Sequence, residues 1–379
     1  MRRQVAVALA AMVAALVTVV ALVTAAPSAP VAGSAPVGGS APVGGSAPVG
    51  GSAGAPRATQ AARSAQAARL APSERPTRGL FPVATTVVRV ALAAGGRRAL
   101  DTEVWYPATN RSGRLVPDRS HAPYPLLVFS QGYDLAVSAY SGLLRHWAAA
   151  GFVVAAPTYP YTAPPGPLDE ADIINHPAEL RLVLSALISA GRQHSSVLSG
   201  LVNAAEVGLA GHSDGGDVSL AVADNTCCHD PSVKALAVLS GAELSSFGGT
   251  YFAGPQVPLL VVQGSADTVN VPACSAQIYD EAKGPKYYLD LIGASHEVPY
   301  VEHPGGENAS GENAGKAPPA ASYRRVVAQA TTDFFKAELA GARGALGSME
   351  RAAKVPGVAQ MTVGGQAPVT AGWCPGSPA

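Results

Sequence analysis

The segment that decides the fold is Val207-Gly208-Leu209-Ala210-Gly211-His212-Ser213-Asp214-Gly215-Gly216. Its first four residues form a short apolar run, typical of a strand buried on both faces, and residues 215–223 continue in a pattern typical of a helix. A serine between two glycines at such a junction matches the sharp turn called a nucleophile elbow, which exposes the serine hydroxyl. Side chains at positions 211 and 215 would collide with neighbouring backbone, so glycine is expected at both.

The bare Gly-x-Ser-x-Gly pattern has little specificity, because Gly50-Gly51-Ser52-Ala53-Gly54 matches it too. Ser52 lies among Ala, Pro, Gly and Ser repeats, with neither a strand before it nor a helix after it. Ser213 has both, and this context makes Ser213 the candidate nucleophile.

Short apolar runs alternate with helix-period segments from about residue 80 to about residue 340. The pattern predicts strands at 83–90, 99–106, 126–129, 152–156, 207–210, 233–239, 258–263 and 286–291. It predicts helices at 139–150, 177–188, 215–223, 272–284 and 322–339. This alternation indicates an α/β fold, in which a mostly parallel sheet is covered by helices on both faces and the first two strands form an antiparallel pair.

The base that activates Ser213 should follow a strand, because ligands of such sheets bind beyond the carboxyl ends of the strands. Three histidines come after Ser213 in the sequence. His296 lies five residues after the strand that ends at 291, whereas His229 follows a helix and His303 lies in a Gly/Pro/Asn-rich loop. His296 is therefore the predicted base.

The acid that orients this base is predicted to be Asp267, which lies just past the strand 258–263. The order Ser, Asp, His along the chain is the one expected for this architecture. Glu243, just past the preceding strand, stays open as an alternative. Asp214 and Asp217 lie on the helix of the nucleophile itself, too close to reach behind the histidine.

An oxyanion hole requires two N–H groups that point at the reacting oxygen. One is expected from the backbone of Asp214, directly after the nucleophile. The other is expected from the loop Ser130-Gln131-Gly132-Tyr133, which follows the strand 126–129. Because Gly132 permits a tight bend, the backbone N–H of Tyr133 is the predicted second donor.

Six segments between 80 and 340 together resemble the α/β-hydrolase superfamily. Within it they are similar to the branch of dienelactone-hydrolase-like proteins, platelet-activating-factor acetylhydrolases and bacterial polyester hydrolases. The segments are Glu103-Val104-Trp105-Tyr106-Pro107, Phe129-Ser130-Gln131-Gly132-Tyr133, Ala150-Gly151-Phe152-Val153-Val154, Gly211–Gly216, Gly264–Pro272 and Gly293–His296.

This resemblance implies hydrolysis of a carboxylic ester, from a small molecule, a lipid or a polyester, through an acyl-serine and without metal or cofactor. Amide or peptide cleavage by the same residues, or a catalytically silent cell-surface binding protein, are the alternatives. Two residues depart from the family pattern. Gln131 stands where His is common, and Asp214 stands where a neutral residue is common, which suggests that anionic substrates are disfavoured.

The N-terminus has the features of an export signal. Arg2 and Arg3 precede an uncharged apolar run from Val5 to about Val23, and small residues then allow a cut after Ala25. The run approaches the roughly 20 residues that span a bilayer, so a retained membrane anchor stays open. We expect a secreted protein with residues 1–25 removed.

Residues 26–79 are rich in Ala, Pro, Gly and Ser and repeat with a six-residue step at Ser34, Ser40 and Ser46. Such a composition buries too little apolar surface to offset chain entropy, so it predicts a disordered linker, as would suit a spacer through a cell envelope. Residues 80–340 are the predicted hydrolase domain. Residues 341–379 form a C-terminal tail without a recognisable motif, and no pattern indicates the oligomeric state.

Charge and cysteine content limit the other functions. The 26 basic and 26 acidic residues balance, and no basic stripe supports nucleic-acid binding. Four cysteines in an exported chain permit disulfides. Because Cys227 and Cys228 are adjacent and a bond between neighbours is strained, we expect them to pair with Cys274 and Cys374, in an order that the sequence leaves open. The segment 227–230 lacks the spaced second pair of a structural zinc site, so no metal is expected.

Overall fold

The structure is a computed structural model that describes residues 80–92, 99–302, 318–369 and 372–374. The predicted export signal at 1–25, the predicted linker at 26–79 and the candidate His303 lie outside the described residues. Across the part of the chain that is described, no helix combines the length and apolar character needed to cross a bilayer.

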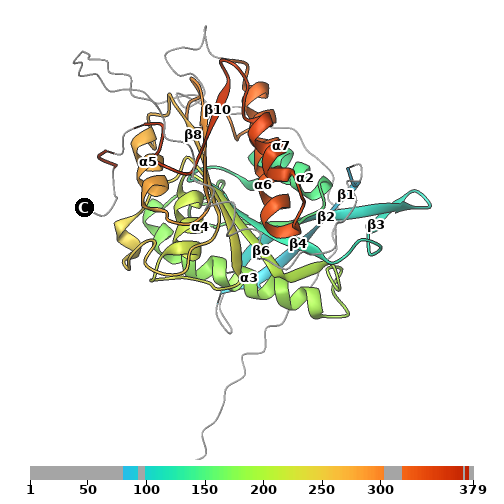
Figure 1. The fold of residues 1–379 in the computed structure, drawn as a ribbon. Helices are drawn as coiled ribbons and strands as arrows, with labels where there is room; N and C mark the ends of the chain where they lie inside the picture. The colour runs from blue at the N-terminus through green and yellow to red at the C-terminus, as the bar shows by residue number, and fades with distance from the viewer. Residues whose placement is uncertain (1–79, 93–98, 303–317, 370–371, 375–379) are drawn as a thin grey trace, which may run out of the picture.

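One mixed sheet runs through the molecule in the order β1-β2-β5-β4-β6-β7-β8-β9-β10, with β3 paired to β2 (Figure 1). The strands are β1 (Val83–Ala91), β2 (Ala99–Arg111), β3 (Arg114–Pro117), β4 (Tyr124–Ser130), β5 (Val153–Pro157), β6 (Val202–His212), β7 (Val233–Leu239), β8 (Leu259–Gly264), β9 (Lys286–Leu291) and β10 (Ala359–Val363). Neighbours from β5 through β9 are parallel, whereas β1, β2, β3 and β10 pair antiparallel. The predicted fold class is confirmed.

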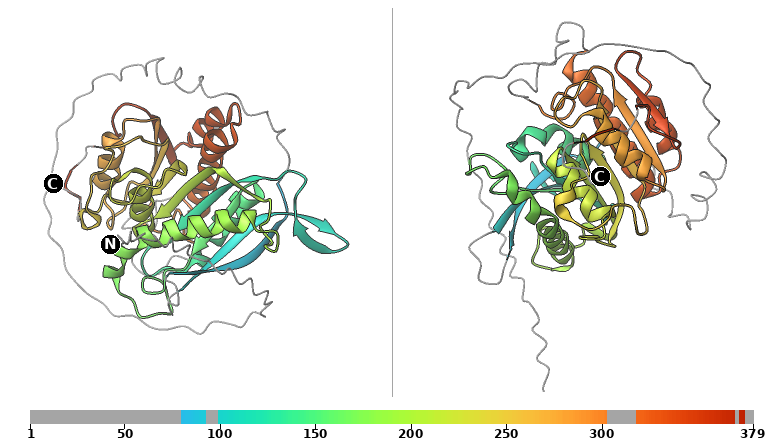
Figure 2. Two further views of the ribbon diagram at one scale, coloured as in Figure 1. Left: turned by 90° about the horizontal axis from the view of Figure 1, so that it is seen from below. Right: turned by 90° about the vertical axis from the view of Figure 1, so that its left-hand side faces the viewer.

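Helices cover both faces of the sheet (Figure 2). They are α2 (Ser141–Ala149), α3 (His176–Arg192), α4 (Asp214–Asp224), α5 (Pro272–Glu281), α6 (Ala320–Ala340) and α7 (Ala345–Ala352), with short 3-10 helices η1 (Val137–Tyr140), η2 (Glu170–Asn175) and η3 (Ser245–Phe247). Apolar side chains of α3, α4 and α5 form one core with the sheet, and those of α2, α6 and α7 form a second. Each sheet face is therefore buried, as continuous apolar strands require.

The helix α3 illustrates how the sequence pattern produces this packing. Pro177 lies in its first turn, where a missing N–H costs nothing. Leu180, Val183 and Leu184 repeat at helical spacing and are buried, whereas Leu182 points outward and is 42% exposed. One stripe of the helix thus joins the core.

The sheet extends past the boundary expected at residue 340. The helix α7 packs on α6, and β10 adds an antiparallel strand to β9. The sequence signal was weak here because β10 is short and its burial is mixed. Near the N-terminal edge, β2 is longer than predicted and turns into β3 at Ser112 and Gly113, both with positive φ.

The expected disulfide pairing is wrong. Cys274 of α5 bonds to Cys374, with a Cα–Cα distance of 4.9 Å, and Cys227 bonds to its neighbour Cys228. The C-terminal segment crosses to the start of α5, and both Cys274 and Cys374 are buried there beside Ala242. With Cys274 and Cys374 paired, the adjacent cysteines bond to each other. Because Cys227 and Cys228 form a disulfide, neither offers the thiolate that a metal site at 227–230 would need.

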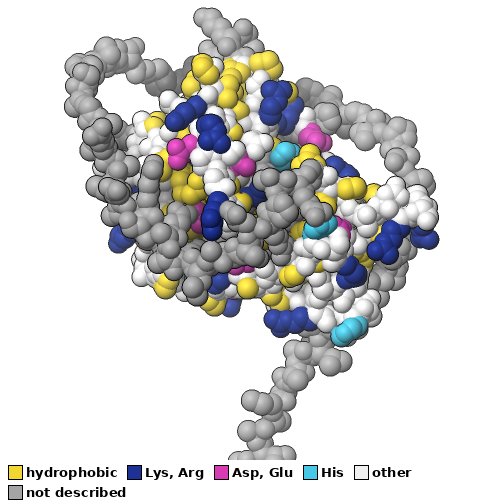
Figure 3. Space-filling model, turned by 45° about the vertical axis from the view of Figure 1, so that its right-hand side comes forward, with side chains coloured by type: hydrophobic (Ala, Val, Ile, Leu, Met, Phe, Trp, Pro, Cys, Tyr) yellow, Lys and Arg dark blue, Asp and Glu magenta, His cyan; other side chains and the backbone are white. Residues whose placement is uncertain are grey.

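On the face drawn in Figure 3, Lys and Arg side chains lie in several separate places among hydrophobic and uncharged groups. The formal net charge is zero. The expectation that nucleic acid is not the ligand stays a prediction.

Candidate active site

Ser213 occupies the sharp turn between β6 and α4. Its backbone has φ 55° and ψ −128°, a left-handed conformation that a residue with a side chain adopts at a cost of order 1–3 kcal/mol. The Ser213 N–H donates to the Leu239 carbonyl at 3.0 Å, which ties the turn to the end of β7. A Cβ added at Gly211 would meet the Gly215 carbonyl, and one at Gly215 would meet the Ser130 carbonyl. The elbow therefore requires glycine at both positions.

His296 lies beside the serine, in the loop that follows β9. Its Nε2 is 2.9 Å from the Ser213 Oγ, in hydrogen-bond geometry. Both residues are largely buried, with exposed fractions of 5% for His296 and 9% for Ser213. The structure thus brings together two side chains that are 83 residues apart in the sequence.

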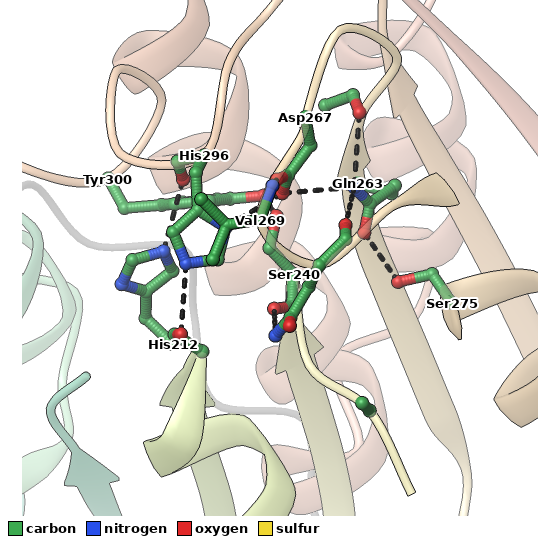
Figure 4. Close-up of polar contacts among 12 residues, drawn as sticks. His212, Ser240, Gln263, Asp267, Val269, Ser275, His296 and Tyr300 are labelled. Atoms are coloured by element: carbon green, nitrogen blue, oxygen red, sulfur yellow. Dashed lines mark hydrogen bonds and ion pairs between the residues drawn. The ribbon is translucent and has the colours of Figure 1, made fainter. Parts of the chain in front are cut away.

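Asp267 lies on the other side of the imidazole. Its Oδ2 is 2.8 Å from the His296 Nδ1 (Figure 4), and the residue as a whole is 3% exposed. The loops that carry the two residues pack tightly, because Ala266 N–H donates to the Ala294 carbonyl at 3.0 Å. Gly264 permits this approach, since a Cβ there would meet the same carbonyl.

Hydrogen bonds fix the Asp267 carboxylate from behind. Its Oδ1 accepts from the Val269 N–H at 2.9 Å, and its Oδ2 accepts from the Gln263 Nε2 at 3.1 Å. The Gln263 Oε1 in turn accepts from the Ser275 Oγ at 2.6 Å (Figure 4). Gln263 was missed from the sequence, although a glutamine ending an otherwise apolar buried strand is a signal, since a buried amide must find partners.

This arrangement defines the protons on His296. The carboxylate can only accept, so Nδ1 carries a proton and donates it to Asp267. Nε2 of the neutral ring is then an acceptor, and the Ser213 hydroxyl donates to it. A hydroxyl in this position can pass its proton to the imidazole as its oxygen attacks.

The loop after β4 lies against the nucleophile. A Cβ on Gly132 would come within 3.2 Å of the Ser213 Cβ, so the backbone preceding Tyr133 packs directly on the serine. Gln131 is buried at 2% exposure. In the orientation that satisfies both ends of its amide, it donates to the Pro157 carbonyl at 2.7 Å and accepts from the Tyr159 N–H at 3.2 Å, which ties this loop to the end of β5.

The other expected donor, the N–H of Asp214, lies at the start of α4. The Ser213 carbonyl accepts from Gly216 N–H at 2.7 Å and from Asp217 N–H at 3.1 Å, so helical bonding begins after Asp214. The first N–H groups of a helix have no acceptor within it and carry partial positive charge. The loop at Gly132 and the start of α4 thus both lie against Ser213. That the amides of Tyr133 and Asp214 form an oxyanion hole stays a prediction.

Among the described residues, neither Glu243 nor His229 has a hydrogen bond to Ser213 or His296. Glu243 is 2% exposed beyond β7, but the carboxylate that bonds to the His296 Nδ1 is that of Asp267. Burial, and next the charge of Glu281, raise the pKa of Glu243 to about 8. His229 places its Nδ1 2.7 Å from the Ala223 carbonyl, at the far end of α4.

Acidic groups lie close to the nucleophile. Burial, and next the nearby Glu170 carboxylate, raise the pKa of Asp214 to about 6, against an opposing effect of His296. Burial also raises the pKa of Asp217 well above its ordinary value, although its Oδ1 accepts from the Ala242 N–H at 2.5 Å. The charge beside Ser213 therefore depends on pH near neutrality.

A model of the chlorophyllase family matches residues 96–242, from just before β2 to just past β7. This match includes Tyr133, Ser213 and Asp214. No curated protein sequence matches the chain. The chlorophyllase family is a family of ester hydrolases within the α/β-hydrolase superfamily. With the mixed sheet and its helical layers, the match shows the α/β-hydrolase fold, and it is consistent with the branch expected from the sequence.

Proposed function

We propose that this protein is an exported serine hydrolase that cleaves carboxylic esters through an acyl-serine intermediate. The observation that carries the proposal is the unbroken line of hydrogen bonds from Ser213 through His296 to Asp267. The match to an ester-hydrolase family supports the choice of substrate bond.

The first half of the proposed reaction forms the acyl-enzyme. The Ser213 Oγ attacks the ester carbonyl carbon while its proton passes to the His296 Nε2. The carbonyl oxygen becomes an oxyanion, which accepts from the backbone N–H groups of Tyr133 and Asp214. When the tetrahedral intermediate collapses, the C–O bond to the alcohol breaks and His296 returns its proton to the leaving oxygen.

The second half releases the acid. A water molecule donates a proton to the His296 Nε2 as its oxygen attacks the acyl-serine carbon. The second oxyanion accepts hydrogen bonds from the same two N–H groups. Collapse breaks the bond to Oγ, and His296 protonates Ser213, so that the enzyme is restored without any cofactor.

Pre-steady-state kinetics with a nitrophenyl ester test this reaction. We expect a burst of nitrophenol equal to the enzyme concentration, followed by slower turnover, since acylation and deacylation are separate steps. Ser213→Ala should abolish the burst and lower kcat by about 10⁵- to 10⁶-fold. Ser219→Ala is the matched control, because the Ser219 Oγ lies on the same helix but donates to the Ala210 carbonyl.

The alternatives predict other outcomes. A nitroanilide cleaved faster than the matching nitrophenyl ester would favour an amide or peptide hydrolase on the same residues. No turnover and no burst with either substrate class would favour a binding protein. Discrimination between the leaving groups thus separates the three functions.

Export of the mature enzyme is part of the proposal. The basic and apolar pattern of residues 1–25 supports secretion, and the repeats up to residue 79 suit a spacer through the envelope. The intact mass of protein from the culture medium should correspond to a chain that begins at Ala26. Protein found only in membranes, with residues 1–25 retained, would instead establish an anchor.

A further inference from the structure

The side chain directly before the nucleophile is hydrogen-bonded at both ring nitrogens. His212 is fully buried at the end of β6. Its Nδ1 is 2.8 Å from the Tyr140 hydroxyl, and its Nε2 is 3.0 Å from the backbone carbonyl of His296. Figure 4 shows His212 beside His296, and the two rings have centroids 4.7 Å apart. A polar side chain buried this deeply calls for a role.

Every proton in this chain of bonds can be assigned. The His296 carbonyl can only accept, so the Nε2 of His212 carries a proton and donates it. The Tyr140 oxygen accepts from the Gly132 N–H at 3.2 Å and donates its own proton to the His212 Nδ1. His212 is therefore a neutral imidazole with its proton on Nε2.

The chain of bonds connects the three parts of the candidate site. Gly132 precedes the expected oxyanion donor of Tyr133, His212 precedes Ser213, and His296 is the expected base. We propose that His212 and Tyr140 are positioning residues, which hold the oxyanion loop, the nucleophile and the base of the candidate site in register. This inference rests on the proposed function and adds two residues that do not touch the substrate.

The charges around His212 favour this neutral form. Burial, and next the positive charge that His296 can carry, hold the pKa of His212 well below its usual range. Burial, Glu297 and Asp214 raise the pKa of Tyr140, so its hydroxyl keeps its proton. The ring of Tyr300, 4.7 Å from His212, is also buried, and its pKa is raised well above the ordinary value. When His296 becomes positive during turnover, His212 therefore adds no second charge.

Substitution of the two residues tests the proposal, because a positioning role should change kcat and leave KM nearly unchanged. We expect Tyr140→Phe and His212→Phe each to lower kcat about 10- to 100-fold with little change in KM, because a shift of the reacting groups by about 1 Å costs that much. The double variant should lose no more than the worse single variant, since both remove one connection. Tyr279→Phe is the control, because its buried hydroxyl donates to the Gly364 carbonyl, away from the site.

A conservative replacement of His212 distinguishes a positioning role, which needs its hydrogen bonds, from a role in packing alone. Glutamine at 212 offers an N–H donor for the His296 carbonyl and an acceptor for Tyr140, whereas phenylalanine offers neither. His212→Gln should recover at least about ten-fold in kcat over His212→Phe. Equal activity of the two variants would overturn the proposal.

Nitrogen-15 NMR of histidine-labelled full-length protein gives a readout that needs no activity and no variant that folds poorly. His212 should show a neutral ring with its proton on Nε2 at every pH from about 5 to about 9. A proton on Nδ1, or titration in this range, would overturn the assignment. If wild type shows the expected tautomer but no ester hydrolysis, the proposed function fails while the chain of bonds stands.

Discussion

Both ring nitrogens of His296 have a partner before any substrate arrives. Nε2 lies 2.9 Å from the serine Oγ, and Nδ1 lies 2.8 Å from the Asp267 Oδ2. Two further donors, from Gln263 and Val269, hold that carboxylate in one orientation. A base whose tautomer and direction are set in advance loses little entropy on the way to the transition state.

Replacement of the carboxylate by an amide tests whether Asp267 sets this tautomer. Asp267→Asn presents an N–H to the His296 Nδ1 or moves the histidine proton to the wrong nitrogen, so kcat should fall about 10³- to 10⁴-fold. Steady-state ester hydrolysis measures the loss. Glu243→Gln is the control and should stay within about three-fold of wild type. A larger loss of kcat in Glu243→Gln than in Asp267→Asn would show that Glu243, not Asp267, is the acid.

The charge of Asp214 should affect the choice of substrate in a pH-dependent way. Its pKa is about 6, raised by burial and by Glu170, so the carboxylate is neutral below that pH and ionised above it. As pH rises through about 6, the ratio of kcat/KM for an anionic hemisuccinate ester to that for the neutral acetate should fall, because like charges repel.

Removal of the charge at position 214 completes this test. Asp214→Asn leaves the backbone N–H in place but carries no charge at any pH. The kcat/KM ratio of the anionic to the neutral substrate should then no longer fall as pH rises through about 6. A ratio with the same pH dependence in wild type and variant would remove Asp214 as the cause.

At the scale of elements, the site is built from four strand ends. Ser213 follows β6, the Gly132–Tyr133 loop follows β4, Asp267 follows β8 and His296 follows β9. All four strands are parallel, so their carboxyl ends meet at one edge of the sheet. Glycines at this edge permit the close approach of the loops.

Because α4 packs closely against the end of β4, one methyl group added at Gly215 should affect both stability and activity. Gly215→Ala places a Cβ against the Ser130 carbonyl, so α4 must move away from the oxyanion loop. We expect a loss of about 1–3 kcal/mol in unfolding free energy, measured in urea, and a kcat reduced by about 100-fold or more.

The matched control for this variant is Gly347→Ala in α7. The nearest atom to its added Cβ is the Arg351 Nη1, at 3.5 Å. Because alanine is the better helix former by about 1 kcal/mol, this variant should be as stable as wild type or more so, and equally active. Equal stability of Gly215→Ala and wild type would contradict the packing described for the elbow.

Prediction from the sequence succeeded where local pattern and tertiary packing agree. The strands β7 and β9 have the predicted bounds, because each is a mainly apolar run in which most residues are buried. The order of Ser213, Asp267 and His296 could be inferred since each follows a strand of a parallel sheet. Their mutual distances could not, because they depend on loops whose backbone is set by long-range contacts such as that between Ala266 and Ala294.

Features held by contacts across the fold were missed. The strand β10 has no strong pattern of its own and is stabilised by pairing with β9. The disulfide partners were misassigned because sequence spacing gives no information on which cysteines meet. His212 and Tyr140 are recognisable only once the distance between their side chains is known.

At the scale of the whole molecule, the Cys274–Cys374 bond ties the C-terminal segment to α5. It links residues 100 positions apart, whereas Cys227–Cys228 joins neighbours. A cross-link restricts the unfolded chain more when it closes a longer loop. The two bonds should therefore contribute very differently to stability.

Serine substitution of each pair measures this difference. Cys274→Ser with Cys374→Ser should lower the unfolding free energy by about 2–4 kcal/mol, and Cys227→Ser with Cys228→Ser by less than about 1 kcal/mol. Urea unfolding monitored by tryptophan fluorescence gives both values, and peptide mapping under non-reducing conditions checks the connectivity. A larger loss for the adjacent pair would contradict the account.

The central claim is that Ser213 is a nucleophile activated by His296. Its most direct test is mass spectrometry after reaction of the native protein with a fluorophosphonate, which modifies activated serines. The account predicts one adduct per chain, located on the peptide that contains Ser213 and lost in His296→Ala. No adduct, or an adduct on another serine, would contradict it.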